Sequence, residues 1–212
     1  MKSVFNLDNP VLRFLSRVFD IAYLNILFLV CSIPVFTIGP SAAALYYCLL
    51  KITRDQDSSI TKMFFGSFKT NLKQGILMTM LFAGIAILLI IDIRLCDTLE
   101  LAFTDYIRTF TYVVLAVFAV TVSYAFPILA QFDNSTMNIL KYSLLLAIYN
   151  FKFTVWIVVL NAVPILIFLN LPEFFVWSIP AWITFGFAVI AMINSRMFVK
   201  IFRKAMPDSQ EL

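Results

Sequence analysis

The chain has 212 residues, of which 62% are apolar and 13% charged, and it carries a net charge of +4. A soluble domain is typically about 45–50% apolar and about 25% charged, so this composition excludes an ordinary soluble domain and predicts an integral membrane protein. The small positive charge does not indicate nucleic-acid binding, because in a membrane protein the position of basic residues matters more than their sum.

Two apolar runs open the chain, and the sequence predicts that they form membrane spans at about 18–36 and 40–54. The short link between them is a predicted helical hairpin whose key residues are Pro34, Thr37, Gly39 and Pro40. Gly39-Pro40 is a turn signal, with a positive φ expected at Gly39. The small residues 41–44 that follow offer a face for close helix approach. The second run is short for a ~30 Å hydrocarbon core, so a re-entrant segment over 40–50 stays open as an alternative.

Residues 58–73 show the pattern of an amphipathic helix in the membrane interface. Ile60, Met63, Phe64, Phe68 and Leu72 recur at helical spacing, and Lys62, Lys69 and Lys73 fall on the opposite face. One interpretation is anchoring beside anionic membrane lipid. The other is a docking surface for a partner protein.

Four further spans are predicted at about 73–93, 107–131, 153–170 and 174–194. The expected fold is therefore all-α, a polytopic bundle of about six spans that forms a single membrane domain over residues 1–212. This layout places every Lys and Arg except Arg94 and Arg108 on the side of the two termini. By the positive-inside rule, both termini are expected to be cytoplasmic.

The residues indicate no enzyme. There is no histidine, and Cys31, Cys48 and Cys96 form no C-x-x-C pair, so we expect no catalytic residue, metal or cofactor. Residues 66–70 lack the spacing of a phosphate-binding loop. The polar residues in or near spans have structural interpretations: an interfacial carboxylate beside Arg17 for Asp20, the membrane exit for Asp92, and an interhelical hydrogen bond for Asn161.

A family resemblance rests on short motifs in the first ~75 residues. They are Leu24-Asn25, Ser32-Ile33-Pro34, Thr37-Ile38-Gly39-Pro40, Ala44-Leu45-Tyr46-Tyr47 and Phe65-x-x-Phe68-Lys69-x-Asn71. In this order they resemble the YesL-like family of bacterial multi-pass membrane proteins. The resemblance implies a protein of the bacterial plasma membrane, whose gene often lies beside carbohydrate importers, glycan-degrading enzymes and two-component sensors.

Three functions follow from that resemblance as expectations. The first is an accessory membrane subunit that stabilises or tunes the membrane subunits of an ATP-driven (ABC) carbohydrate importer. The others are a regulatory partner of a sugar-responsive sensor kinase and a small independent transporter. The candidate contact residues for a partner are Phe64, Phe68, Lys69, Asn71 and Lys73.

Overall fold

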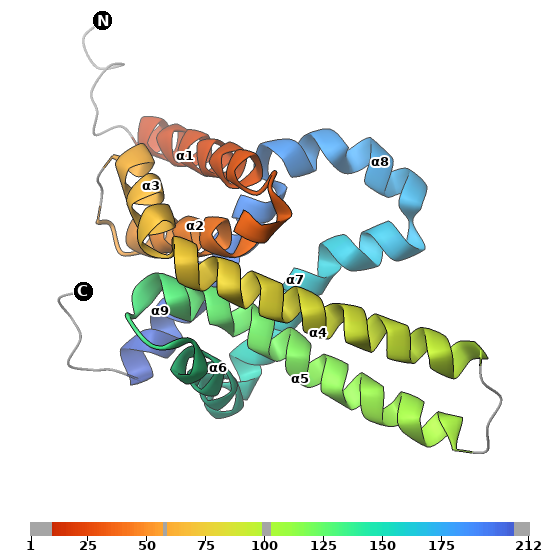
Figure 1. Ribbon diagram of the computed structural model, residues 1–212. Helices are drawn as coiled ribbons and strands as arrows, with labels where there is room; N and C mark the ends of the chain where they lie inside the picture. Colours follow the sequence, from red (N-terminus) through yellow and green to blue (C-terminus); the bar gives the residue numbers. More distant parts are fainter. Residues whose placement is uncertain (1–9, 57–58, 99–102, 206–212) are drawn as a thin grey trace, which may run out of the picture.

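The computed structural model describes residues 10–56, 59–98 and 103–205, and these residues form a bundle of helices (Figure 1). The helices in chain order are α1 (Pro10–Cys31), α2 (Ile38–Thr53), α3 (Ile60–Thr70), α4 (Leu72–Thr98), α5 (Thr104–Gln131), α6 (Thr136–Tyr149), α7 (Phe151–Asn170), α8 (Pro172–Ala181) and α9 (Phe187–Ala205). A 3₁₀ turn, η1 (Val35–Thr37), precedes α2, and a π-helical turn, η2 (Trp182–Gly186), joins α8 to α9.

Within the described residues, six stretches are long and apolar enough to cross a membrane, which confirms the all-α, multi-pass fold. They are Phe14–Cys31, Val35–Thr53, Leu72–Thr98, Thr104–Gln131, Phe151–Asn170 and Pro172–Ala205. The predicted loop at 94–106 is shorter than expected, because α4 continues to Thr98 and α5 begins at Thr104.

Helix α2 lies at the centre of the bundle, in contact with α1, α3, α4, α5 and α9. Ser41, Ala43 and Ala44 are fully buried on it, because small side chains let neighbouring helices approach closely. The small-residue face predicted from the sequence is therefore covered by the chain's own helices.

The hairpin before α2 differs from the prediction. The chain turns at residues 32–37, and Gly39 and Pro40 already lie in the first turn of α2, where a proline is tolerated. Among the described residues no glycine has a positive φ, so the expected left-handed conformation at Gly39 is wrong. The Thr37 hydroxyl closes the turn by donating to the carbonyl oxygens of Cys31 and Pro34, both at 2.6 Å.

Gly39 is needed for contact with α4. Its N–H donates to Thr79 Oγ1 at 3.0 Å, and Gly75 lies directly against Pro40. From Thr79, α4 runs on to Thr98, about 28 Å at ~1.5 Å per residue. The hairpin tip therefore lies well short of the far ends of α4 and α5 (Figure 1), and we expect it to end within the apolar part of the membrane.

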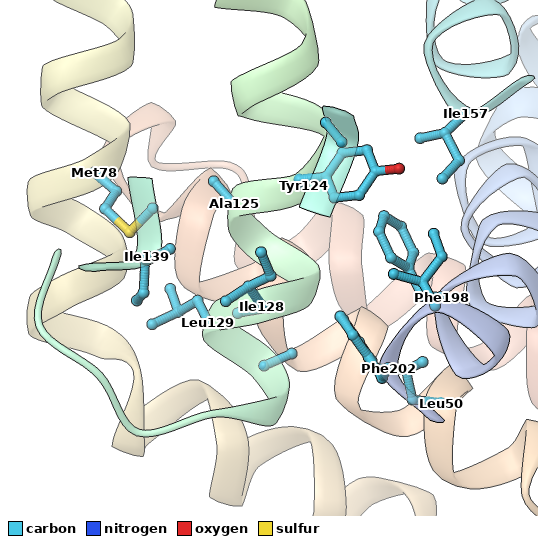
Figure 2. Packing of buried hydrophobic residues seen from close by; sticks show 14 of the residues in the cluster. Leu50, Met78, Tyr124, Ala125, Ile128, Leu129, Ile139, Ile157, Phe198 and Phe202 are labelled. Carbon is cyan, nitrogen blue, oxygen red and sulfur yellow. The ribbon is translucent and has the colours of Figure 1, made fainter. Parts of the chain in front are cut away.

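The main core surrounds α5 (Figure 2). Met78 and Ile139, from α4 and α6, lie on one side of this helix, while Tyr124 points toward Phe198 of α9 on the other. The Tyr124 and Phe198 rings meet edge to face, with centroids 5.1 Å apart. A second core joins α1, α2, α3 and the start of α9.

One end of the bundle carries α3, the start of α4 and the ends of α2 and α9 (Figure 1). We call it the basic end, because Lys51, Arg54, Lys69, Lys73 and Arg203 lie there. Partial burial and the charge of Arg203 lower the pKa of the Arg54 guanidinium. The ordinary pKa of arginine is so high that Arg54 remains a cation near neutral pH.

Candidate functional site: helix α3 and the adjoining polar pocket

Helix α3 forms where the sequence predicted an amphipathic helix, and its apolar face packs inward. Phe64 is fully buried in the second core, and Phe68 stacks on it with ring centroids 6.4 Å apart. Ile60 and Met63 pack against the same cluster. This face is thus covered by the chain's own helices rather than by lipid.

Two of the predicted contact residues, Phe64 and Asn71, are buried in this structure. Asn71 is 8% exposed, and its side-chain amide donates to Ser67 O at 3.0 Å and to Ser67 Oγ at 3.2 Å. The backbone carbonyl oxygen of Asn71 accepts a hydrogen bond from the N–H of Gly75 at 2.7 Å. Asn71 therefore holds the junction between α3 and α4. Phe64 is fully buried, whereas Asn71 also belongs to the lining of the polar pocket beside α3.

Of the other predicted contact residues, Lys69 lies on the outward face of α3, Lys73 lies in the first turn of α4, and Phe68 stacks on Phe64 on the inward face. Lys69 and Lys73 are exposed, whereas Phe68 is half-buried. The sequence analysis missed two neighbours on the outward face, Phe65 and Gly66, both of which are exposed. We define the α3 strip as five exposed residues along α3 and the start of α4: Lys62, Phe65, Gly66 and Lys69 of α3, and Lys73 in the first turn of α4.

Gly66 is the one residue of the α3 strip without a side chain. A Cβ atom built on it meets no heavy atom within 4 Å, so the chain itself does not require a glycine there. A glycine in a helix interior is destabilising by about 0.5–1 kcal/mol relative to alanine. An exposed glycine flanked by lysines leaves room for another molecule to approach the backbone closely.

A polar pocket of about 330 Å³ adjoins the α3 strip. Lys62, Ser67 and Thr70 line it from α3, Gln131 lines it from the end of α5, and Asp133 lines it from the α5–α6 connector. The α5–α6 connector is held in place by Gln74 of α4, whose amide donates to Asn134 O at 2.8 Å.

The pocket offers hydrogen-bonding groups together with one positive and one negative side chain. Lys62 and Asp133 are its only charged lining residues within the part of the chain that the structure describes. In those same residues no cluster of His, Cys, Asp or Glu could hold a metal ion. This arrangement suits recognition of a polar peptide segment through hydrogen bonds.

A second polar group lies inside the bundle, where Asn25 of α1 binds the π-helical turn. Its amide donates to the carbonyls of Trp182 at 3.0 Å and Ile183 at 2.6 Å, and its Oδ1 accepts the N–H of Ala188 at 2.9 Å. A π turn disturbs the regular helical hydrogen bonds, and backbone groups left unpaired in lipid are costly. Asn25, which is fully buried, satisfies three of them.

The predicted interhelical hydrogen bond of Asn161 is confirmed. Its amide donates to Ser123 Oγ on α5 at 3.1 Å, and its Oδ1 accepts from the Asn194 amide of α9 at 2.8 Å. Asn194 also lies 3.3 Å from the Tyr46 hydroxyl of α2. One polar chain thus connects four helices, and sequence analysis found only one of its members.

Of the two aspartates singled out in the sequence, Asp92 lies near the end of α4, whereas Asp20 lies in the middle of α1. Asp92 accepts a hydrogen bond from Thr111 across the α4–α5 pair. Arg17 forms an ion pair with Asp55 at 3.1 Å. The Asp55 side chain is almost fully exposed, so this pair contributes little to stability.

Comparison with known proteins agrees with the sequence motifs. The model of a family described as "Protein of unknown function, DUF624" matches residues 21–93, which run from α1 through the hairpin and α3 to most of α4. The chain is 28% identical to the uncharacterized protein YteU of Bacillus subtilis (strain 168) over 167 residues, 76% of this chain and 74% of YteU. It is 24% identical to the uncharacterized protein YesL of the same strain over 151 residues, 69% of this chain and 71% of YesL. No solved structure matches. The resemblance to the YesL-like family is confirmed.

Proposed function

We propose that this multi-pass membrane protein is an accessory subunit that binds the membrane subunits of an ATP-driven carbohydrate importer through the α3 strip. The proposal rests on the α3 strip, which is exposed and basic and has Gly66 at its centre. The opposite face of α3 packs into the second core. The resemblance to the YesL-like family supplies the class of partner.

The proposal includes an orientation in the bacterial plasma membrane. The start of α1 and the end of α9 lie at the basic end, together with α3 (Figure 1). The positive-inside rule assigns such an end to the cytoplasm. The α3 strip would then face the side on which the importer's ATPase works.

The intramembrane polar residues support a packing role. Asn25, Asn161 and Asn194 each hydrogen bond to another helix of the bundle, so their amides serve to fix helices against one another. An accessory subunit needs a rigid body that presents one contact surface, and these bonds provide rigidity.

Co-purification from detergent-solubilised membranes tests the proposal. A tagged wild-type chain is expected to recover the permease pair encoded beside its gene. The double variant Lys62→Glu/Lys69→Glu should lose this recovery, because it reverses the charge of the α3 strip. The double variant Lys141→Glu/Lys152→Glu is the matched control, since both lysines are exposed and lie on α6 and α7 rather than on the α3 strip.

A second variant tests shape instead of charge. A Cβ atom at position 66 meets no heavy atom within 4 Å, so Gly66→Trp should keep the fold. It places a large ring on the α3 strip and should block the permease. Recovery of a sensor kinase without a permease would favour the regulatory alternative. Solute movement by the purified chain in liposomes would contradict both.

A further inference from the structure

A second cavity, of about 390 Å³, lies at the basic end between the ends of α5 and α9 and the short helix α6. Its size falls in the range of small-molecule sites, about 300–1,000 Å³. None of the described residues of α3 lines it, and Phe132 is the one lining residue that it shares with the polar pocket beside α3. The cavity is therefore considered separately from the α3 strip.

The walls of this cavity are mostly apolar. Ile128 and Phe132 line it from the end of α5, Leu146 from α6 and Phe202 from α9. The polar group of Asn150 is already committed, because its amide donates to Leu146 O at 3.0 Å. An apolar chain is the kind of group that such walls accommodate.

Positive charge lies at one edge of the cavity. Lys204, in the last turn of α9, is part of the lining, and its neighbour Arg203 is exposed beside it. No acidic residue occurs among the described residues that line the cavity. The occupant should thus combine an apolar chain with an anionic group.

The outer surface of α6 continues the apolar lining toward the membrane. Leu145 and Tyr149 belong to the lining and are exposed, and Ile148 between them is 75% exposed. Tyrosine is enriched at membrane–water interfaces. The cavity therefore opens where phospholipid headgroups and chains meet.

We propose that this cavity binds an anionic phospholipid, with one acyl chain between α5, α6 and α9 and the phosphate beside Lys204. Basic pockets between transmembrane helices on the cytoplasmic side are typical binding sites for anionic headgroups. Bound there, the lipid fills space that the three helices leave open, and it ties α6 to the end of α9.

Native mass spectrometry of the full chain in detergent tests the site. The probes are phosphatidylglycerol and phosphatidylcholine with identical acyl chains, added at equal concentrations. The wild type is expected to retain one phosphatidylglycerol and to prefer it over phosphatidylcholine by about fivefold, the effect of one basic residue near a headgroup. Lys204→Gln should bring the ratio close to one. Lys69→Gln, which removes an equal charge on α3, should leave it unchanged.

A filling variant separates the cavity from general surface charge. Leu146→Trp should reduce retention of both lipids, and Leu145→Trp at the more exposed mouth serves if the first variant does not fold. Equal retention of the two lipids by the wild type would overturn the proposal, as would unchanged retention in both tryptophan variants. Loss of a co-purifying peptide, with lipid retention unaffected, would assign the cavity to a protein segment instead.

Discussion

Replacing Gly39 by alanine should destabilise the protein, whereas the same change at Gly66 should stabilise it. A Cβ atom at position 39 would lie 2.3 Å from Thr79 Oγ1 and 2.5 Å from the carbonyl oxygen of Gly75. Optimal contacts between heavy atoms are about 3.5–4.0 Å, so both overlaps exceed ~1 Å. One of the two contacts is with backbone, which cannot move aside as a flexible side chain can.

The magnitude follows from two opposing effects. Inserting a methyl group into a packed site costs about 1–3 kcal/mol, and two severe contacts favour the upper part of that range. Alanine in a helix gains about 0.5–1 kcal/mol over glycine. The net loss for Gly39→Ala is therefore about 2 kcal/mol, or about 4–8 °C in melting temperature for a chain of this length.

The assay is thermal unfolding of purified variants in one detergent, followed by fluorescence-detected size exclusion. Gly66→Ala and Gly84→Ala are matched controls, because a Cβ at either position meets no atom within 4 Å. Both should melt at or slightly above the wild-type temperature. If Gly39→Ala melts with the controls, the close contact between α2 and α4 does not exist.

Three further changes test the interior and the hairpin. Asn25→Ala should lower the free energy of unfolding by about 2 kcal/mol, since it removes three interhelical hydrogen bonds of about 0.6 kcal/mol each. Ile26→Ala, on the exposed side of α1, should lower it much less in the same thermal assay. Asn161→Ala should lower it by about 1 kcal/mol through two lost bonds, and a wild-type melting temperature would contradict the four-helix network. Accessibility of the hairpin tip is tested in a background without native cysteines, with an impermeant thiol reagent applied outside intact cells. Val35→Cys should not be labelled, whereas Thr98→Cys should be labelled. Equal labelling would show that the hairpin crosses the whole membrane.

The spans could be predicted from sequence because lipid imposes a simple rule. Every backbone polar group in the hydrocarbon must be satisfied within the segment, so long apolar runs become helices. The same rule does not fix helix ends outside the membrane. This is why α4 and α5 continue into the region of Asp97 and Asp105 that was expected to be a loop.

Gly39 is important in the hairpin, but for a different physical reason from the one that the sequence predicted. Gly39 was interpreted as a turn residue, which would have required a special φ. The backbone at Gly39 is helical, and glycine is needed because a Cβ atom there would overlap Thr79 Oγ1 and the carbonyl oxygen of Gly75. Gly75 carried its own signal as a glycine near the start of a long apolar helix, but the sequence could not reveal that the two glycines face each other.

The contact residues were only partly predictable for a related reason. Helical spacing correctly separated the apolar and basic faces of α3, but it does not say what covers the apolar face. An apolar face can pack against lipid or against another helix such as α2 with the same sequence pattern. The pattern therefore could not predict that Phe64 is buried within the chain. The partners of Asn25 are backbone atoms more than 150 residues away in a π turn, and no side chain marks them.

Photo-cross-linking from the α3 strip tests the central claim most directly. The residue p-benzoylphenylalanine is introduced in living cells at position 66, with position 84 on α4 as the control, because both positions are open in this chain. The proposed function predicts a covalent adduct with an importer membrane subunit from position 66 and none from position 84. An adduct with a sensor kinase, or the same products from both positions, would contradict it.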